Sequence, residues 1–160
     1  MIDLRIVVIS DSHGRGNIVE KILYAQSSAK HVFFLGDCVS DIEDFEFLFP
    51  QMRFHIVAGN CDYFSTQPTT ALEIIEGKRI FFTHGHTFYV KGGDGPLIEN
   101  ARKNAYDIVL YGHTHTSKIL YDDGIYVVNP GSCSRGRDGK QSYAVIDIEK
   151  NGILPNIIYI

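Results

Sequence analysis

The side chains of this 160-residue chain that are best suited to chemistry follow short apolar runs, where strands are expected to end. The first such group is Asp11-Ser12-His13, directly after the apolar run 6–9. A carboxylate and an imidazole one residue apart can bind one metal ion, although Asp11 alone could instead cap a following helix. Ligands of open α/β sheets bind at the carboxyl ends of the strands. If Asp11 and His13 begin a metal site, later strands should end in further ligands.

Four later apolar runs do end in ligand-type residues. These are Asp37, Asn60, the pair His84 and His86, and the pair His113 and His115. Gly-Asp and Gly-Asn taken singly are ordinary turn sequences. Two histidines one residue apart after a buried strand are seldom needed for packing, so the recurrence at five strand ends favours a metal site. Glycine precedes Asp37, Asn60 and His113, and its missing Cβ lets other groups approach the backbone closely.

The candidate ligands are too numerous for one ion of the first transition row, so we expect two divalent ions. They are Asp11, His13, Asp37, Asn60, His84, His113 and His115. Two such ions with two carboxylates and a bridging hydroxide would carry a net charge of about +1, which suits an anionic substrate. Mixed imidazole and carboxylate ligands fit manganese, nickel, iron, cobalt or zinc better than calcium or magnesium. Ligand type does not separate these five metals, and we take manganese as the expected ion.

The elements expected to hold these residues form one mixed α/β domain over residues 1–160. Strands are predicted at 4–9, 31–35 and 54–58, separated by a helix from Asn17 to Ala25 and by a second helix, capped by Ser40 or Asp41, that ends at Pro50. Three consecutive βα units imply a parallel sheet. The second half predicts a hairpin of strands 70–75 and 79–83, a helix at 97–104, and strands at 108–111, 118–121, 125–128, 142–148 and 153–159.

Composition excludes several classes of protein. The net charge of −4 and the pI near 5.9 give no reason to expect a nucleic-acid partner or an anionic membrane. No apolar run approaches the length that crosses a bilayer and no secretion signal is evident, so a cytoplasmic location without a membrane is expected. The three cysteines suggest neither a disulfide framework nor a structural zinc site. Cys38 is expected to be a small buried apolar side chain rather than a thiolate ligand.

The ordered motifs resemble a known family. Asp11-Ser12-His13, Gly36-Asp37-Cys38, Gly59-Asn60-Cys61-Asp62, His84-Gly85-His86 and Gly112-His113-Thr114-His115 closely resemble the motifs of the calcineurin-like metallophosphoesterase superfamily. The short chain and the later Asn129-Pro130-Gly131-Ser132 resemble its small prokaryotic phosphodiesterase branch. The resemblance implies a four-layer αββα sandwich of two mixed β-sheets flanked by helices.

The resemblance also implies roles for the ligands. By motif position Asp11, His13 and His115 would bind one ion, Asn60, His84 and His113 the other, and Asp37 would bridge them. The implied reaction is hydrolysis of a small phosphoester, most simply a phosphodiester, by in-line attack of a metal-bridging hydroxide. Asp37, Asn60, His84, Cys61 and His86 would form the catalytic site.

Three positions near this site carry open alternatives. Many members of the family have a histidine at the position of Cys61, which is thought to protonate the leaving group, so Cys61 is here a candidate weak acid. His86 is interpreted either as facing the substrate or the ligands, or as making a plain structural hydrogen bond. Arg135 or Arg137 could meet a phosphate oxygen, and Arg137 better matches the family's position.

Other functions are weighed against this one. The same fold serves as a protein-interaction scaffold, so a non-catalytic metal-binding scaffold is the alternative. Gly14-Arg15-Gly16 lacks the third glycine of a dinucleotide-binding loop, so that reading is discounted. Phe45, Phe47, Leu48 and Phe49 are explained mainly by a helix packed in the core, with some aromatic surface left for a homodimer contact.

Overall fold

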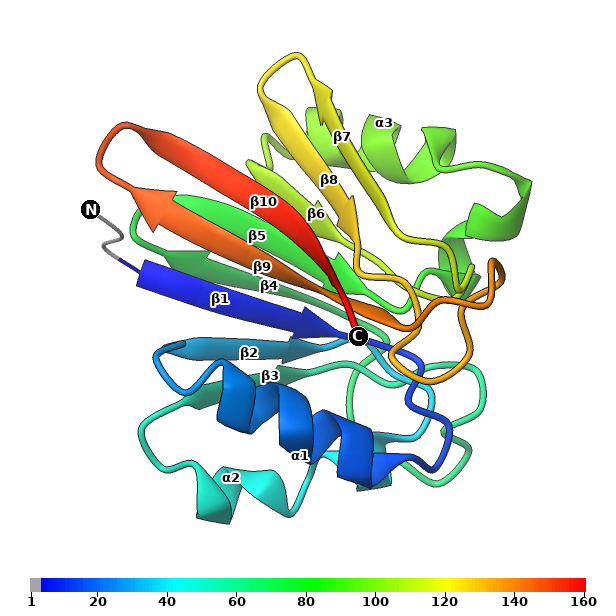
Figure 1. The fold of residues 1–160 in the computed structure, drawn as a ribbon. Coiled ribbons are helices and arrows are strands. Elements are labelled where there is room, and N and C mark those ends of the chain that lie inside the picture. Colours follow the sequence, from blue (N-terminus) through cyan, green and yellow to red (C-terminus); the bar gives the residue numbers. More distant parts are fainter. Residues whose placement is uncertain (1–3) are drawn as a thin grey trace.

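The computed structural model describes residues 4–160. In this part of the chain, ten strands form two five-stranded sheets that lie face to face, with helices on their outer sides (Figure 1). The strand order is β10-β9-β1-β2-β3 in the first sheet and β4-β5-β6-β8-β7 in the second. Both sheets mix parallel and antiparallel pairs, so the predicted αββα sandwich is confirmed.

The first sheet carries the parallel βα units of the N-terminal half. Its strands are β1 (Leu4–Ile9), β2 (His31–Phe34), β3 (Arg53–Ile56), β9 (Ser142–Glu149) and β10 (Gly152–Tyr159). β1, β2 and β3 are parallel, whereas β9 is antiparallel to both β1 and β10. The predicted third strand, 54–58, therefore lies one to two residues too late.

The second sheet has a parallel centre and antiparallel edges. Its strands are β4 (Thr70–Ile75), β5 (Lys78–Thr83), β6 (Ile108–Leu110), β7 (Lys118–Asp122) and β8 (Ile125–Asn129). β5, β6 and β8 are parallel, and β4 and β7 pair antiparallel at the two edges. The predicted hairpin joins β4 to β5 through Glu76 and Gly77, whose φ angles of 50° and 74° match the two-residue turn that the right-handed twist of strands favours.

Successive side chains of the central strands point to opposite faces of the sheet, and both faces are buried, which explains why these sequences are apolar throughout. In β1, Ile6 and Val8 face the core between the two sheets, while Val7 and Ile9 face the core beneath the first helix. In β5, Phe82 faces the central core and Phe81 faces the outer core on the other side of the molecule. A strand buried on both faces needs apolar residues at every position, which is the pattern read from the sequence.

Helices cover the two outer faces. They are α1 (Gly16–Ala25), α2 (Phe45–Leu48) and α3 (Gly95–Lys103), with 3-10 turns at Val39–Asp41, His86–Phe88 and Val90–Gly92. Val19, Ile22 and Leu23 of α1 pack on the first sheet, and Leu97 and Ala101 of α3 pack on the second. In residues 4–160, none of the helices is long and apolar enough to cross a membrane.

The helix starts predicted in the first half need correction. α1 begins at Gly16 after Arg15, which makes no side-chain cap, so Asn17 lies inside the helix. The second helix shrinks to the single turn α2, because Asp41 is used elsewhere: its Oδ2 accepts hydrogen bonds from Ser12 Oγ and from the Gly14 amide at 2.9 Å. Asp41 therefore holds the loop after β1 rather than capping a helix.

The aromatic side chains of α2 are not all in the core. Phe49 is buried, but Phe47 is 87% exposed and Leu48 is 58% exposed. Core packing thus explains Phe45 and Phe49, while Phe47 and Leu48 form the remaining exposed surface, because a helix of one turn directs only a narrow face toward the core.

Candidate metal centre

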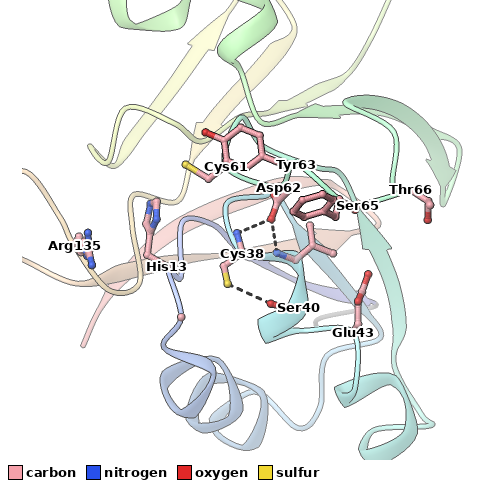
Figure 2. A pocket seen from close by; sticks show the side chains of 13 residues that line it. His13, Cys38, Ser40, Glu43, Cys61, Asp62, Tyr63, Ser65, Thr66 and Arg135 are labelled. Atoms are coloured by element: carbon pink, nitrogen blue, oxygen red, sulfur yellow. Dashed lines mark hydrogen bonds between the residues drawn. The ribbon is translucent and has the colours of Figure 1, made fainter.

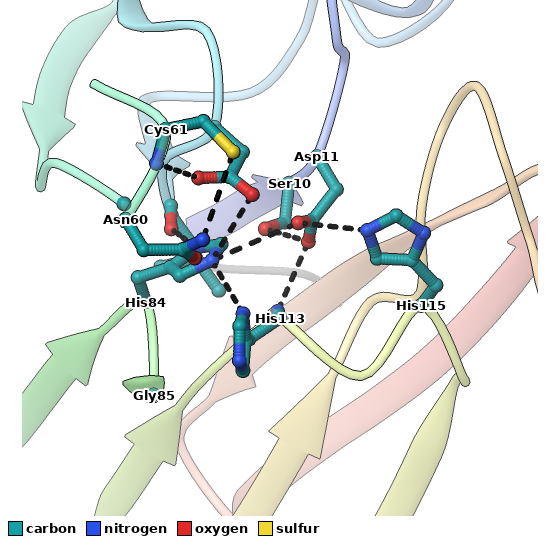
Figure 3. Close-up of polar contacts among 12 residues, drawn as sticks. Ser10, Asp11, Asn60, Cys61, His84, Gly85, His113 and His115 are labelled. Carbon is teal, nitrogen blue, oxygen red and sulfur yellow. Dashed lines mark hydrogen bonds and ion pairs between the residues drawn. The ribbon is translucent and has the colours of Figure 1, made fainter. Parts of the chain in front are cut away.

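The predicted ligands follow the carboxyl ends of β1, β2, β3, β5 and β6, which meet at one end of the sandwich. Asp11, Asp37, Asn60, His84 and His113 follow these strands in that order. Figure 3 shows Asp11, His84, His113 and His115 directed toward a common centre. Residues separated by about 100 positions in the chain are thereby brought into contact, since His113 N donates to Asp11 Oδ2 at 3.1 Å.

Left-handed backbone turns aim these side chains inward. Such φ values are uncommon outside glycine, and they concentrate at functional sites where the surrounding structure holds them. The ligand candidates concerned are Asp11 (φ 57°), His13 (46°), Asp37 (62°), His113 (71°) and His115 (56°). The strand ends therefore turn sharply enough for residues one apart to face the same space.

Two glycines make room for the carboxylates. A Cβ at Gly59 would collide with Asp37 Oδ1, and a Cβ at Gly112 would collide with Ser10 Oγ and lie 2.8 Å from Asp11 Oδ2. Neither obstacle is the free end of a mobile side chain, because both carboxylates are buried. Glycine before Asn60 and before His113 is thus required for the close approach expected from the sequence.

Ring nitrogens meet in two pairs. His13 Nε2 lies 3.2 Å from His115 Nε2, and His84 Nε2 lies 3.1 Å from His113 Nδ1. Nitrogens that bind one ion at the usual ~2.0–2.1 Å are about 2.8–3.4 Å apart when the angle at the metal is near 90–109°. Each pair is therefore spaced as two ligands of a single ion would be.

The outer nitrogens fix the tautomers of two of these rings. His84 Nδ1 donates to the carbonyl oxygen of Leu35 at 2.6 Å, and His115 Nδ1 donates to that of Arg135 at 2.9 Å. A carbonyl oxygen only accepts, so in each neutral ring Nε2 carries a lone pair directed into the centre. Metal-binding histidines typically donate their second nitrogen in this way.

The two carboxylates complete two groups. Asp37 Oδ2 lies 3.7 Å from His13 Nε2 and 3.4 Å from His84 Nε2, so it stands between a ring of each pair. Asp11 Oδ1 lies 3.2 Å from His115 Nε2. The potential ligand atoms form one group of Asp11, His13, Asp37 and His115 and a second group of Asp37, His84 and His113. Asp37 belongs to both.

A buried orphan atom shows that the centre suits a cation. Asp11 Oδ1 is fully buried and has no hydrogen-bond donor among residues 4–160. An anionic oxygen that faces imidazole lone pairs without a donor is costly to bury unless a positive charge lies between them. The donor set of two carboxylates and four imidazoles fits two divalent ions, and this fit follows from the side chains themselves.

The pKa values of the cluster also reflect the uncompensated negative charge of its buried carboxylates. Burial would raise the pKa of Asp11, but the nearby rings of His115 and His13 lower it far below its usual range. The carboxylate of Asp11, whose Oδ1 lies 3.2 Å from Nε2 of His115, raises the pKa of that histidine. For His84, burial is outweighed by Asp37 and Asp11, and the pKa is raised. His113, buried and next to His84, has its pKa lowered to about 4. The two buried carboxylates therefore favour positive charge at the centre of the cluster.

The remaining predicted site residues lie around these groups. Asn60 is exposed and donates from Nδ2 to Cys61 Sγ at 3.6 Å, and Figure 3 shows both beside His84. The Cys61 amide donates to Asp37 Oδ1 at 3.0 Å, and burial together with Asp37 raises the pKa of its thiol. The ring of His86 lies 5.4 Å from that of His84, outside both groups, and its buried Nδ1 has no hydrogen-bond partner among residues 4–160.

Asp62, the last residue of the motif Gly59-Asn60-Cys61-Asp62, holds the loops that carry two of the candidate ligands, a role that was not predicted for it. Its carboxylate accepts four backbone hydrogen bonds, from the amides of Asp37 (2.8 Å), Cys38 (2.9 Å), Val39 (2.8 Å) and Gly59 (2.7 Å). These bonds join the loop after β2 to the loop after β3. Asp62 thereby fixes the position of Asp37 relative to Asn60. The sequence signal that could have indicated this role is an acidic residue two positions after a candidate ligand.

Serines support Asp11 in a similar way. Ser10 Oγ donates to Asp11 Oδ2 at 2.6 Å, and the hydroxyls of Ser132 and Ser134 both donate to the Asp11 carbonyl at 2.8 Å. Ser132 belongs to the motif Asn129-Pro130-Gly131-Ser132, and it lies behind the first candidate ligand, where it holds the left-handed turn at Asp11.

A pocket of about 810 Å³ opens beside the centre (Figure 2). His13, Cys61 and Arg135 line it. Arg137 is not in the lining, although its backbone amide donates to the carbonyl oxygen of His115 at 3.0 Å. Cys38 also lines the pocket and is only partly buried, with Sγ 3.4 Å from Ser40 Oγ. The expectation that Cys38 is a buried core side chain is wrong, because its φ of 87° turns it out of the sheet.

A two-sheet sandwich with a buried Asp/His cluster at the strand ends defines the chain as a metallophosphoesterase-type α/β domain. The profile of the "Calcineurin-like phosphoesterase superfamily domain" matches residues 4–151, so the chain belongs to this superfamily. Its similarity is to the small YfcE/MJ0936-type phosphodiesterase branch.

Known proteins similar to this chain span nearly its whole length. Phosphodiesterase YfcE of Escherichia coli is 32% identical, over 90% of this chain and 88% of its own. The probable metallophosphoesterase YsnB of Bacillus subtilis is 26% identical, over 92% and 86%. A crystal structure of a predicted phosphoesterase from Streptococcus pneumoniae superposes with a TM-score of 0.84 at 29% identity, covering 99% of this chain and 91% of that one.

Proposed function

We propose that this protein is a phosphodiesterase that binds two divalent ions, manganese in the first instance, and hydrolyses a small phosphoester. The observation that carries the proposal is the position of Asp37 Oδ2, 3.7 Å from a ring nitrogen of one group and 3.4 Å from a ring nitrogen of the other. A carboxylate shared by two groups of ligands sets the spacing of two ions. When bound, such ions polarise phosphoryl oxygens and lower the pKa of a coordinated water.

The residues of the chain supply the positioning for this chemistry. The carbonyls of Leu35 and Arg135 hold the rings of His84 and His115 so that Nε2 faces the centre. Arg135 lines the adjoining pocket, where a guanidinium can bind phosphate oxygens. Asn60 would add a neutral oxygen ligand to the group of His84 and His113.

Cys61 is the proposed acid near the leaving group. Its raised pKa keeps the thiol protonated at neutral pH, so a proton is available at Sγ. A thiol is nevertheless a weak donor compared with a histidinium. We therefore expect phenolic esters, which leave without much help, to be cleaved faster than simple alkyl esters. A series of aryl and alkyl diesters measures this, and rates independent of the leaving-group pKa would contradict the role of a weak acid.

The decisive experiment combines elemental analysis with an assay on one preparation. Protein loaded separately with manganese, nickel and zinc should contain about two ions per chain and hydrolyse bis-p-nitrophenyl phosphate. Chelation should abolish the activity, and the metal that restores it best identifies the preferred ion. Asp122→Asn, at a half-buried carboxylate of β7 that pairs with Arg102 at 2.8 Å and lies outside both ligand groups, serves as the control that should retain metal and activity.

A non-catalytic scaffold is the alternative that this experiment separates. Vps29 from Chaetomium thermophilum shares the fold, with a TM-score of 0.77 at 20% identity, but a likeness at this level concerns the fold alone. Protein that binds two ions yet cleaves neither diesters nor monoesters under any of the three metals would favour the scaffold.

A further inference from the structure

We propose that the pocket beside the metal centre recognises an alcohol that carries a positively charged amino group, so that the substrate is a phosphoester of a cationic amino alcohol. The inference rests on the phosphodiesterase function proposed above and adds the chemical class of its substrate. The pocket of about 810 Å³ has the size of a small-molecule site.

The two ends of the pocket differ in charge. Figure 2 shows His13 and Arg135 on one side and Glu43 and Thr66 on the other. The first end adjoins the metal centre and suits a phosphate. The second end carries the carboxylate of Glu43. Opposite charges at the two ends of one pocket fit a ligand that is negative at one end and positive at the other.

Glu43 is available to a ligand. Its side chain is exposed, and it makes no ion pair or side-chain hydrogen bond with any of residues 4–160. The other carboxylate of the lining, Asp62, is already held by four backbone amides. Residues 41–46 contain four acidic side chains and no basic one, so the local potential at this end is negative although Arg135 lines the other.

Two aromatic side chains belong to the same pocket lining as Glu43. Tyr63 is 83% exposed and Phe64 is 99% exposed, and both line the pocket. Large aromatic side chains this exposed contribute little to the core, whereas the face of an aromatic ring attracts an ammonium group. A carboxylate together with two free aromatic rings forms a recognisable site for a quaternary or primary ammonium group.

A nucleobase is the competing ligand, because bases also stack on exposed aromatic rings. A neutral base would gain nothing from the charge of Glu43. Dependence on Glu43 therefore separates the two ligands, and we favour the cationic one because the acidic side chain lies within the lining.

The experiment measures binding by calorimetric titration of the metal-loaded protein. The probes are phosphocholine and 3,3-dimethylbutyl phosphate, which has the same shape without the positive charge. We expect phosphocholine to bind about tenfold more tightly. Glu43→Gln should reduce this preference to about twofold or less. The matched control Glu46→Gln removes the same charge three residues away, outside the pocket lining, and should keep the preference.

Several results would overturn the inference. These are equal binding of the two probes by the wild type, an unchanged preference in Glu43→Gln, or adenosine 5′-monophosphate binding more tightly than phosphocholine in both wild type and variant. The free and lipid-bound forms of the headgroup are separated by titrating glycerophosphocholine and by sedimentation with phosphatidylcholine vesicles. We expect the soluble ester to bind and the vesicles not to, and vesicle binding that depends on Glu43 would assign the same recognition to a lipid headgroup.

The inference and the proposed function fail in different ways. Hydrolysis of bis-p-nitrophenyl phosphate without any preference for the charged probe contradicts the inference alone. A clear charge preference in protein that hydrolyses no phosphoester contradicts the proposed activity and leaves the ligand class standing.

Discussion

Two groups of histidines in this protein show how neighbours decide what an imidazole does. Five histidines gather at the carboxyl ends of the strands around Asp11 and Asp37. The other two, His31 of β2 and His55 of β3, pair with each other: His31 Nδ1 lies 2.9 Å from His55 Nε2. The ring of His55 stacks on Phe33 with centroids 4.5 Å apart, and its only acidic contact among residues 4–160 is Glu73 at 3.5 Å.

The pKa values of His84 and His115 distinguish these two members of the cluster from the pair, whereas His113 and His86 of the cluster have lowered pKa values as the paired histidines do. Burial and the neighbouring His55 lower the pKa of His31 to about 4, and burial lowers that of His55. The pKa values of His84 and His115 are raised, because two buried carboxylates face their rings. The paired histidines therefore remain neutral and structural, whereas the clustered ones require positive charge among them. The difference lies in the carboxylates and not in the histidines.

Removing the shared carboxylate should have the largest effect. Asp37→Asn takes away the one group common to both sets of ligands, so we expect both ions to be lost and activity to fall by about 10³-fold. Elemental analysis and the rate on bis-p-nitrophenyl phosphate measure this. The control Asp122→Asn should retain both, and two tightly bound ions in Asp37→Asn would show that Asp37 does not bridge.

Removing a single imidazole should affect one group only. His13→Ala should lower the metal content from about two ions to about one, because Asp37, His84 and His113 remain together. His55→Gln, which removes an imidazole of the other kind, should keep two ions. Unchanged near-ultraviolet circular dichroism would verify that both variants are folded. Equal loss of metal from His13→Ala and His55→Gln would contradict the assignment of metal binding to the cluster alone.

Removing hydrogen bonds that hold the loops behind the ligands should reduce metal affinity less than removing a ligand does. Asp62→Asn replaces one carboxylate oxygen by an amide NH₂ that cannot accept from the backbone, so at least one pair of the four amide bonds is lost. Changes behind metal ligands typically weaken metal binding about 10–100-fold, and we expect a loss in this range. Competition titration against a metal indicator measures it. Affinity equal to that of the wild type would show that Asp62 holds the fold without positioning Asp37.

The smallest effect should appear in the pH dependence of the metal-free protein. The lowered pKa of His31 means that its contribution to stability is present above its ordinary pKa of 6.5 and is lost as pH falls toward about 4. The raised pKa values of His84 and His115 act in the opposite direction, because their contribution is present below 6.5 and is lost as pH rises.

The variant His31→Gln isolates the first contribution. Between pH 6.5 and 4.5 the melting temperature of the metal-free wild type should fall by about 3 °C more than that of the variant. Scanning calorimetry in the presence of a chelator measures the difference. Parallel curves would show that His31 is not held neutral by its surroundings.

Much of the fold and of the candidate metal site could be predicted from the sequence, because the relevant signals are local. An apolar run such as Ile6–Ile9 reports burial on both faces, and a histidine, aspartate or asparagine placed just after such a run is delivered to the strand end whatever the rest does. These local signals therefore predicted the parallel units, the hairpin at Glu76 and Gly77 and the clustering of the strand-end residues, whereas the two-sheet sandwich was implied by the family resemblance.

Other features depended on groups far apart in sequence. Asp41 could be read as a helix cap, yet its contacts are Ser12 and Gly14, and the helix expected there shortens to α2. Cys38 could be read as a core residue, yet a left-handed turn places it in the pocket. The residues next to a polar side chain in the sequence do not determine whether it hydrogen-bonds to nearby backbone or to a distant segment. The predictions for Asp41 and Cys38 were therefore wrong.

By itself the sequence determined which residue types stand at the strand ends, because the period and length of the apolar runs set where strands stop. The family resemblance implied how those residues divide into two groups, but only the tertiary structure gave the distances between them and decided that Arg135, Glu43 and two exposed aromatic rings lie in the same pocket lining. The physical reason is that distances between loops depend on how the two sheets pack, and sheet packing is the sum of many contacts that no single motif contains.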